Sequence, residues 1–274
     1  MFTFEVRFQT FTIMWAELKK YKDEYLSLNL DEKINYSTFS MISIVWNSTK
    51  IEGCSLDEND TRLLLEKNIT AKGKPLTDHL MVKDHYDAFL FIQEQSREKR
   101  MLSIPFLIDV AAQVMKNTGG IVKTVSGDFD KSKGDLRLTQ VYVDKKYFPD
   151  FKKVPGLLEK LCSIVNEKLN DVEGTDVVKL AADLHYNLVN IHPWGDGNGR
   201  VSRLMMNYIQ LYHNEPLIKI FTEDRAEYIQ ALNETEEKNN PEIFREFIAS
   251  QQLKFFKAEI EKYRNRGVDF KLLF

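Results

Sequence analysis

The stretch His192-Pro-Trp-Gly-Asp-Gly-Asn-Gly-Arg-Val-Ser-Arg203 decides which fold this chain of 274 residues can adopt. It gathers a titratable imidazole, a carboxylate, three glycines and two arginines, and few structural demands need all of them at once. Apolar residues recur at helical spacing before it, from Val177 to Ile191, and Pro193 ends that period. A second helical period runs from Val201 to Tyr212. The sequence therefore predicts two helices that are joined by a tight, glycine-rich loop.

The loop lies at the predicted start of the second helix, where unpaired N–H groups and a partial positive charge favour an anion. Glycines let the backbone approach a ligand closely, and the successive amides of Gly197, Asn198 and Gly199 can form an anion-binding nest. Arg200 and Arg203 add forked donors for further phosphate oxygens. This combination predicts a polyphosphate ligand.

Two further side chains of the loop predict chemistry on that ligand. A polyphosphate normally arrives with Mg²⁺, which takes one or two carboxylates together with phosphate oxygens, and Asp196 is the only carboxylate of the loop. His192 can take a proton from an attacking hydroxyl. Each residue type alone has a plainer interpretation as a helix cap, a turn or a solvated helix face. Their complementarity to one ligand favours a functional site.

The segment resembles the signature of the Fic (filamentation induced by cAMP) family, His-Pro-Phe-x-Asp/Glu-Gly-Asn-Gly-Arg-x-x-Arg. Only Trp194 departs from it, and a larger aromatic can still fill an apolar pocket. The resemblance implies a mainly α fold, a Fic-type helical bundle with a short β-hairpin flap beside the active-site loop. It also implies an enzyme that transfers AMP from ATP to a hydroxyl side chain of a target protein. His192 would then be the general base and Asp196 the Mg²⁺ ligand.

The resemblance also implies which residues bind the nucleotide. The loop would hold the α-phosphate and its two arginines the β- and γ-phosphates; these residues are Gly197, Asn198, Gly199, Arg200 and Arg203. The segment from Arg225 to Leu232 is similar to the family segment whose tyrosine lies beside the adenine. Tyr228 would then stack on the base or hydrogen-bond to it, and the alternative is a core aromatic on an amphipathic helix.

A second motif lies far upstream. Ser48-Thr-Lys-Ile-Glu52-Gly53 fits the Ser/Thr-x-x-x-Glu-Gly/Asn inhibitory motif of the same family. A helical carboxylate can pair bidentately with an arginine that the γ-phosphate needs, and a nucleotide then cannot take its productive pose. A glutamate followed by a glycine cap is common at helix ends, but the resemblance implies that Glu52 pairs with Arg203 and inhibits the enzyme in cis.

The flap is expected between Gly120 and Val143. The runs from Ile121 to Val125 and from Leu136 to Val143 favour strands, and glycines between them indicate a hairpin. Gly134-Asp-Leu-Arg137 resembles the family step that leads into a flap on which a protein target docks as an added strand. An ordinary surface hairpin fits the residues equally well, and Arg137 receives no role.

The rest of the chain divides into three predicted parts: an N-terminal helical region at 1–100 with the inhibitory motif, a Fic core at 101–250, and a C-terminal helical extension at 251–274. Phe2, Phe4, Val6 and Phe8 alternate with polar residues, which predicts a short N-terminal strand. His185 lies seven residues before His192, a spacing that allows a shared metal but is more typical of an ordinary helix residue.

Composition excludes some classes of protein. The chain is 43% hydrophobic, and no apolar run approaches the length of a membrane span, so no membrane contact is expected. A net charge of −3 offers no general attraction to nucleic acid. Cys54 and Cys162 lack any disulfide or metal pattern, which indicates a reducing, cytoplasmic compartment. ATP and a protein target are the expected partners, and a homodimer stays open.

Three alternatives for the function also stay open. Some members of the family transfer another phosphate-containing group, and some remove AMP from their target. A nucleotide-sensing interaction module with negligible catalysis is the third alternative, although pure binding would need no base at His192.

Overall fold

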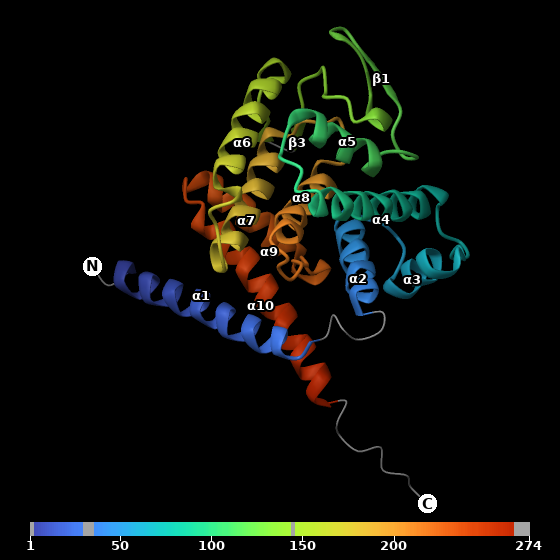
Figure 1. The fold of residues 1–274 in the computed structure, drawn as a ribbon. Helices are drawn as coiled ribbons and strands as arrows, with labels where there is room; N and C mark the ends of the chain where they lie inside the picture. Colours follow the sequence, from blue (N-terminus) through green and yellow to red (C-terminus); the bar gives the residue numbers. More distant parts are fainter. Residues whose placement is uncertain (1–2, 30–35, 144–145, 266–274) are drawn as a thin grey trace, which may run out of the picture.

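The computed structural model describes residues 3–29, 36–143 and 146–265 as a bundle of helices with two small hairpins (Figure 1). The helices in these ranges are α1 Thr3–Ser27, α2 Tyr36–Ile51, α3 Glu58–Lys67, α4 Leu76–Arg97, α5 Ile104–Val114, α6 Val154–Leu169, α7 Thr175–Ile191, α8 Asn198–Tyr212, α9 Arg225–Glu237 and α10 Glu242–Asn265. The strands are β1 Ile121–Thr124, β2 Gly127–Asp130, β3 Tyr142–Val143 and β4 Lys146–Tyr147. The prediction of a mainly helical fold is therefore confirmed.

Helix α8 lies at the centre of the bundle. It packs along α7, and α4 and α5 also pack against it. A helix that is buried on all sides is normally apolar, yet α8 carries buried polar residues at its N-terminal end and beyond: Asn198, Arg200, Ser202, Arg203, Asn207 and Gln210. Buried polar groups need partners. Asn207, in the second half of α8, serves the fold, because its side chain exchanges hydrogen bonds with the backbone N–H and C=O of Ile218.

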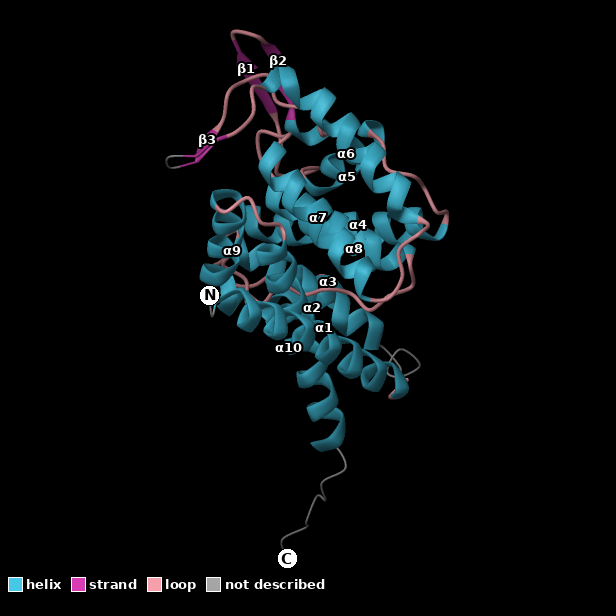
Figure 2. Cartoon of the chain, turned by 90° about the vertical axis from the view of Figure 1, so that its left-hand side faces the viewer, coloured by secondary structure: helices cyan, strands magenta, loops and turns pink. Residues whose placement is uncertain are grey.

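The N-terminal segment is a helix, and the prediction of a strand there is wrong. Phe4, Val6 and Phe8 fall within α1, while Phe2 lies outside the described residues. Three or four alternating positions are a weak signal, and the longer helical pattern that continues through Leu18 and Tyr25 prevails. Figures 1 and 2 show α1 lying against α10. Leu18 and Tyr25 of α1 are buried in the main core.

Helix α2 follows α1 in the chain and packs beside the central helices. It contacts α4, α8 and the short 3₁₀ helix η4 Thr222–Asp224. The side chain of Asn47 accepts a hydrogen bond from the Thr222 backbone N–H, at 2.9 Å, and so ties α2 to that 3₁₀ helix. Val45 packs on the opposite side in a second cluster with Cys54, Leu56, Leu64 and Val82. The C-terminal end of α2 is thereby held from two sides.

The hairpin forms, but with a different partner from the one expected. β1 pairs with β2 in antiparallel register, so that Ile121 lies opposite Asp130 and Thr124 opposite Gly127. Gly127 adopts φ of +123°, which allows the chain to reverse within two residues. The run from Leu136 does not pair with β1. Its end forms a second hairpin instead, in which β3 pairs with β4.

Figure 2 shows both hairpins gathered at the end of the molecule that lies away from α1 and α10. The 3₁₀ helices η2 Lys131–Lys133 and η3 Phe151–Lys153 join them to the bundle. At the other end of the chain, α10 runs without a break across the predicted division at residue 250. Its buried side chains before and after that point belong to one core, as Ile248 and Phe256 do.

Helix α3 provides a test of local stability. The Asp57 side chain accepts from the Asp60 N–H at 2.7 Å and the Asp60 side chain accepts from the Asp57 N–H, which completes a capping box. Asp57→Ala should lower the free energy of unfolding by about 1 kcal/mol in urea denaturation. Glu66→Ala, on the exposed face of the same helix, should change it by less than about 0.5 kcal/mol. Equal effects of the two substitutions would contradict this role of the cap.

Candidate functional site

The loop between α7 and α8 is held by its own side chains. His192 ends α7 in the left-handed conformation, with φ of 52°, and its N–H donates to the Leu188 carbonyl. Asn198 closes the turn, because its side chain accepts from the Trp194 N–H at 3.0 Å and donates to the Trp194 carbonyl at 2.8 Å. Trp194 is buried and its indole N–H donates to the Gly134 carbonyl. Both polar atoms of the Asn198 side chain are thus used within the loop. An anion at this turn would therefore bind to backbone N–H groups rather than to the Asn198 side chain.

Two glycines of the loop are required by their surroundings. Gly197 precedes α8 with φ of +81°, and a Cβ there would lie 3.0 Å from the Met115 sulfur. A Cβ on Gly199 would lie 2.4 Å from Oε1 of Glu52 and 3.0 Å from Nη1 of Arg203. The first turn of α8 thus leaves just enough space for a carboxylate from α2.

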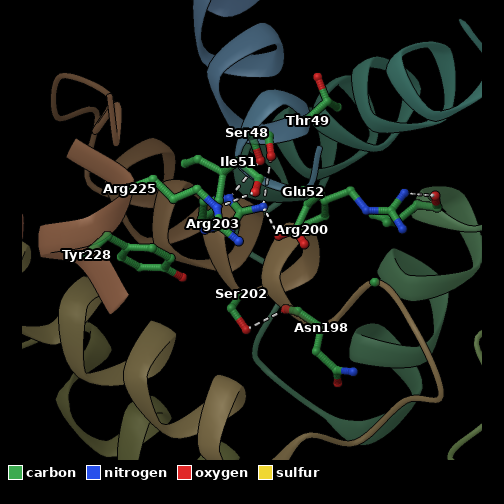
Figure 3. Close-up of polar contacts among 12 residues, drawn as sticks. Ser48, Thr49, Ile51, Glu52, Asn198, Arg200, Ser202, Arg203, Arg225 and Tyr228 are labelled. Carbon is green, nitrogen blue, oxygen red and sulfur yellow. Dashed lines mark hydrogen bonds and ion pairs between the residues drawn. The ribbon is translucent and has the colours of Figure 1, made fainter. Parts of the chain in front are cut away.

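Glu52 and Arg203 meet at this point, as the resemblance implied (Figure 3). Oε1 of Glu52 accepts from Nη2 of Arg203 at 2.6 Å, while Ser48 accepts from Nε at 2.8 Å through its hydroxyl and from Nη2 at 3.0 Å through its carbonyl. The carboxylate uses one oxygen, so the expected two-point pairing is replaced by one ion pair plus Ser48. Ser48 lies in the last turn of α2, and Glu52 directly follows the last helical residue, Ile51, so the two residues are one helical turn apart and lie on the same side.

The end of α2 fixes the position of Glu52. Gly53 has φ of +93°, its N–H donates to Lys50, and the Cys54 N–H donates to Thr49, which together form a glycine C-cap. Nε of Arg225 donates to the Ile51 carbonyl at 2.9 Å. The pattern of a glutamate followed by a glycine cap is therefore a structural motif here as well as a match to the inhibitory motif. Gly53 ends the helix immediately after the residue that reaches Arg203.

Charge dominates the protonation state of Glu52. Burial alone would raise the pKa of this carboxyl, but the neighbouring cations, with Arg203 first among them and Arg200 and Arg225 after it, hold the pKa below its ordinary value. The side chain keeps 36% of its surface exposed. Glu52 is thus a carboxylate at neutral pH that solvent still reaches.

The first arginine of the signature, Arg200, is also buried, with 3% of its surface exposed. Arg200 donates to the Val114 carbonyl at 3.4 Å and to the Met115 sulfur at 3.2 Å, and its Nη2 lies 3.5 Å from Oδ1 of Asp196. Nε of Arg200 and Nη1 of Arg203 have no hydrogen-bond partner among the described residues. Two buried guanidinium groups with unsatisfied donors at a helix N-terminus favour an anion.

Asp196 is the residue of the loop that fits a divalent cation. Its side chain is 53% exposed, Oδ1 accepts from the Gly197 N–H at 2.6 Å, and Oδ2 lies 4.0 Å from Nζ of Lys131. In the part of the chain that the structure describes, no three His, Cys, Asp or Glu side chains are arranged to hold a metal. A single open carboxylate suits Mg²⁺, which fills its remaining positions with phosphate oxygens and water.

His192 is held as a neutral imidazole. Nδ1 lies 3.3 Å from the Val189 carbonyl, and the ring stacks on Phe148 with centroids 4.0 Å apart. Burial lowers the pKa of His192 to about 4, and the charges of Arg137 and Lys146 act in the same direction. When Nδ1 carries the proton toward Val189, Nε2 is left as an acceptor. That is the arrangement a general base needs.

Tyr228 lies in the core, and its predicted role of stacking on a base or hydrogen-bonding to it stays a prediction. It is 3% exposed, its ring packs against Phe244 and Phe247, and its hydroxyl lies 3.1 Å from Nε2 of His185. This burial agrees with the alternative of a core aromatic on an amphipathic helix. His185 is fully buried in the same cluster, which leaves Tyr228 as its partner rather than a metal.

The sequence analysis missed Arg137, which is 1% exposed. Its guanidinium donates to three backbone carbonyls, those of His192, Thr139 and Pro149. An arginine shortly after a glycine turn was the available signal, but nothing in the local pattern indicated that it is buried against the signature loop.

The helical bundle with a glycine loop at a helix N-terminus is the fold of Fic-domain proteins. The Fic/DOC family model matches residues 101–210, and the chain contains a Fic/DOC family domain. The match covers the flap region and the signature loop, and α2 lies before it.

Curated relatives are protein adenylyltransferases. The proteins named fic-1 from Caenorhabditis briggsae and Caenorhabditis elegans are each 33% identical over 196 residues, which is 69% of this chain and 35% of theirs. Protein adenylyltransferase Fic from Nematostella vectensis is 30% identical over 193 residues, 69% of this chain and 42% of that protein. The chain thus spans about a third of the length of the first two relatives.

Solved structures share the fold. Fic-1 from C. elegans superposes with a TM-score of 0.76 at 25% identity, over 96% of this chain and 76% of that one. A Fic domain containing signaling protein from Bacteroides thetaiotaomicron gives a TM-score of 0.71 at 21% identity, over 95% of this chain and 99% of that one. Within the described residues, no helix is both long and apolar enough to cross a membrane.

The state of His192 gives a prediction on pH. A folded-state pKa of about 4, below the ordinary 6.5, means that stability from the neutral ring is complete above pH 6.5 and is lost as the pH falls toward 4. NMR of histidine-labelled protein, assigned by the signal missing in His192→Gln, should show one ring that titrates near pH 4. Titration of that ring between pH 6 and 7 would contradict the buried, neutral state.

Proposed function

We propose that this protein is a Mg²⁺-dependent adenylyltransferase that transfers AMP from ATP to a hydroxyl side chain of a protein target, and that Glu52 inhibits it in cis. The observation that carries the proposal is the pair of buried arginines below the loop. Arg200 and Arg203 keep unsatisfied donors at a helix N-terminus, and a carboxylate of the same chain occupies the space beside them. A polyphosphate satisfies those donors, and Glu52 competes with it.

The loop supports the first step, which is binding. The backbone N–H groups of Asn198 and Gly199 lie in the first turn of α8 and hold the α-phosphate, while Arg200 and Arg203 hold the phosphates that leave. Gly197, whose own N–H donates to Asp196, provides the left-handed turn before them. Asp196 would hold Mg²⁺, which neutralises phosphate charge when it is bound. The protein's contribution is a set of donors that are fixed before the reaction begins.

His192 supports the second step, which is proton transfer. The target hydroxyl oxygen attacks the α-phosphorus in line, the bond from that phosphorus to the bridging oxygen breaks, and pyrophosphate leaves. Nε2 of His192 accepts the hydroxyl proton. Because the ring is neutral above pH of about 4, the base is available throughout the physiological range.

The similarity to curated protein adenylyltransferases supports the choice of AMP. A second candidate, removal of AMP from a modified target, is favoured by one observation. Only Oε1 of Glu52 takes part in the described hydrogen bonds, and the side chain is 36% exposed. The other oxygen could then orient a water molecule toward the phosphorus of a bound AMP group.

Label transfer tests the main proposal. With α-³²P-ATP, Mg²⁺ and a host lysate, Glu52→Gly should label protein at least about tenfold faster than wild type, since tenfold corresponds to about 1.4 kcal/mol of lost inhibition. Adding His192→Ala should lower that rate by a factor of about 10² to 10⁴. Glu66→Gly, which changes an exposed helical glutamate away from the site, should behave as wild type.

Each outcome of the label transfer separates one claim. A Glu52→Gly protein no faster than wild type would overturn the inhibition, and label that persists in the double variant would overturn His192 as the base. Label added to the target beforehand and released faster by wild type than by Glu52→Gly would favour AMP removal. ATP binding by calorimetry with no covalent product in any variant would favour a nucleotide-sensing module or another transferred group.

Asp196 provides a test of the metal. In the Glu52→Gly background, Asp196→Asn should weaken Mn²⁺ binding in the presence of ATP by at least about tenfold, since one carboxylate ligand is lost. Electron paramagnetic resonance of free Mn²⁺ measures this directly. Asp183→Asn, a carboxylate paired with Arg245 away from the loop, should leave Mn²⁺ binding unchanged. Equal Mn²⁺ affinity in all three proteins would show that Asp196 is no ligand.

A further inference from the structure

Arg137 connects the signature loop to the flap segment, which here comprises residues 139–143 and 146–149 with strands β3 and β4. Nε donates to the His192 carbonyl at 2.7 Å, Nη1 to the Thr139 carbonyl at 2.7 Å, and Nη2 to the Pro149 carbonyl at 2.6 Å. Its own backbone N–H donates to the Pro193 carbonyl at 3.0 Å. One side chain therefore ties together the residue that ends α7 and the two ends of the segment that carries β3 and β4.

The flap segment in turn positions the imidazole. Phe148 stacks on the His192 ring, and it is held in place because its N–H donates to the Val141 carbonyl and its carbonyl accepts from the Gln140 side chain. Val141 and Phe148 lie between the two carbonyls, of Thr139 and Pro149, that Arg137 holds. Loss of Arg137 would free both ends of the segment that presses Phe148 onto the ring.

His192 itself depends on the same contact. It is one of the few non-glycine residues with a positive φ, at 52°, a conformation that persists only where the surroundings hold it. The Arg137 guanidinium fixes the carbonyl of this residue, and the Leu188 carbonyl fixes its N–H. Both peptide groups beside the His192 Cα are thus restrained.

We infer that Arg137 is a positioning residue of the site. It sets both the orientation of the His192 ring and the position of the flap segment beside that ring. The inference rests on the proposed function for its effect on catalysis, but the contacts that carry it are independent of the transferred group. A planar guanidinium has five N–H donors and can reach three carbonyls in different directions. The ammonium of a lysine has all its donors on one nitrogen and cannot reproduce that geometry.

Charge gives Arg137 a second effect on the ring. The charged groups that act on His192 are Arg137, Lys146 on β4, and Glu52 at the end of α2. The two cations oppose protonation of the ring and Glu52 favours it, with burial as the largest cause of the low pKa. Arg137→Met removes both the charge and the fork, whereas Arg137→Lys keeps the charge and removes the fork. The two variants therefore separate orientation from electrostatics.

The test combines kinetics with a readout that needs no catalysis. In the Glu52→Gly background, both Arg137 variants should lower kcat by about 10²-fold, the size expected when a reacting group is displaced by about 1 Å. The Kd of ATP should change less than about threefold, since Arg137 contacts no phosphate-binding residue. Amide exchange of Val141 and Phe148 should speed up in both variants. The His192 pKa, followed by NMR in the otherwise wild-type protein, should rise clearly in Arg137→Met and by less in Arg137→Lys.

Arg245→Met is the matched control. Arg245 is a half-buried arginine that pairs with Asp183 and Glu242, outside the site, so its loss lowers stability without touching His192 or the flap. It should leave the His192 pKa and kcat unchanged at temperatures where it is folded. Melting curves of all variants, followed by circular dichroism, define that temperature range.

The outcomes distinguish this inference from the proposed function. If Glu52→Gly transfers no label but the Arg137 variants alter the His192 pKa and the amide exchange, the proposed function fails and the positioning role stands. If label is transferred while kcat, the pKa and the exchange stay as in the parent, Arg137 has no positioning role. If the Arg245 control changes kcat and the pKa as much as Arg137→Met does, the effect is one of general stability and the inference fails.

Discussion

The structure depends on a guanidinium that is buried almost completely beneath the start of a helix. Arg203 is 4% exposed, and a buried cation is stable only where an anion or a set of oriented acceptors faces it. In this chain α2 supplies both, since Ser48 offers a hydroxyl and a carbonyl and Glu52 offers a carboxylate. The N-terminal region is thereby part of the site, although it lies outside the matched family domain.

A second constraint is that the base must stay neutral in a field made largely by cations. Arg200 and Arg203 lie below the loop, and Arg137 and Lys146 lie on the side of His192. A polyphosphate gains from all of this positive charge, whereas an imidazolium would be opposed by it and by burial. One arrangement of charge therefore attracts the proposed substrate and keeps His192 able to accept a proton.

The sequence predicted the local parts of this site and failed where distant contacts decide. The helix–loop–helix around the signature could be predicted because Pro193, the glycines and the apolar periods act within a few residues. The contact between Glu52 and Arg203 spans 151 positions, and only the resemblance to a family linked them. Tyr228 and Arg137 are buried by segments far along the chain, which periodicity does not reveal. The predicted partner of β1 was wrong, because the tight turn at Gly127 pairs β1 with the adjacent strand β2 rather than with the more apolar but more distant run from Leu136.

The geometry also bears on how the proposed inhibition could end. Moving α2 as a whole would break the hydrogen bonds from Thr222 to Asn47 and from Arg225 to Ile51, together with both Ser48 contacts to Arg203. Rotating the Glu52 side chain alone breaks one ion pair, and that side chain is already 36% exposed. After such a rotation Ser48 would still accept from Nε and from one N–H of Nη2, which leaves Nη1 and the second N–H of Nη2 for the ligand. Rotation of the side chain breaks fewer contacts and keeps α2 docked. The helix that precedes the inhibitory carboxylate would then still orient Arg203 for a phosphate.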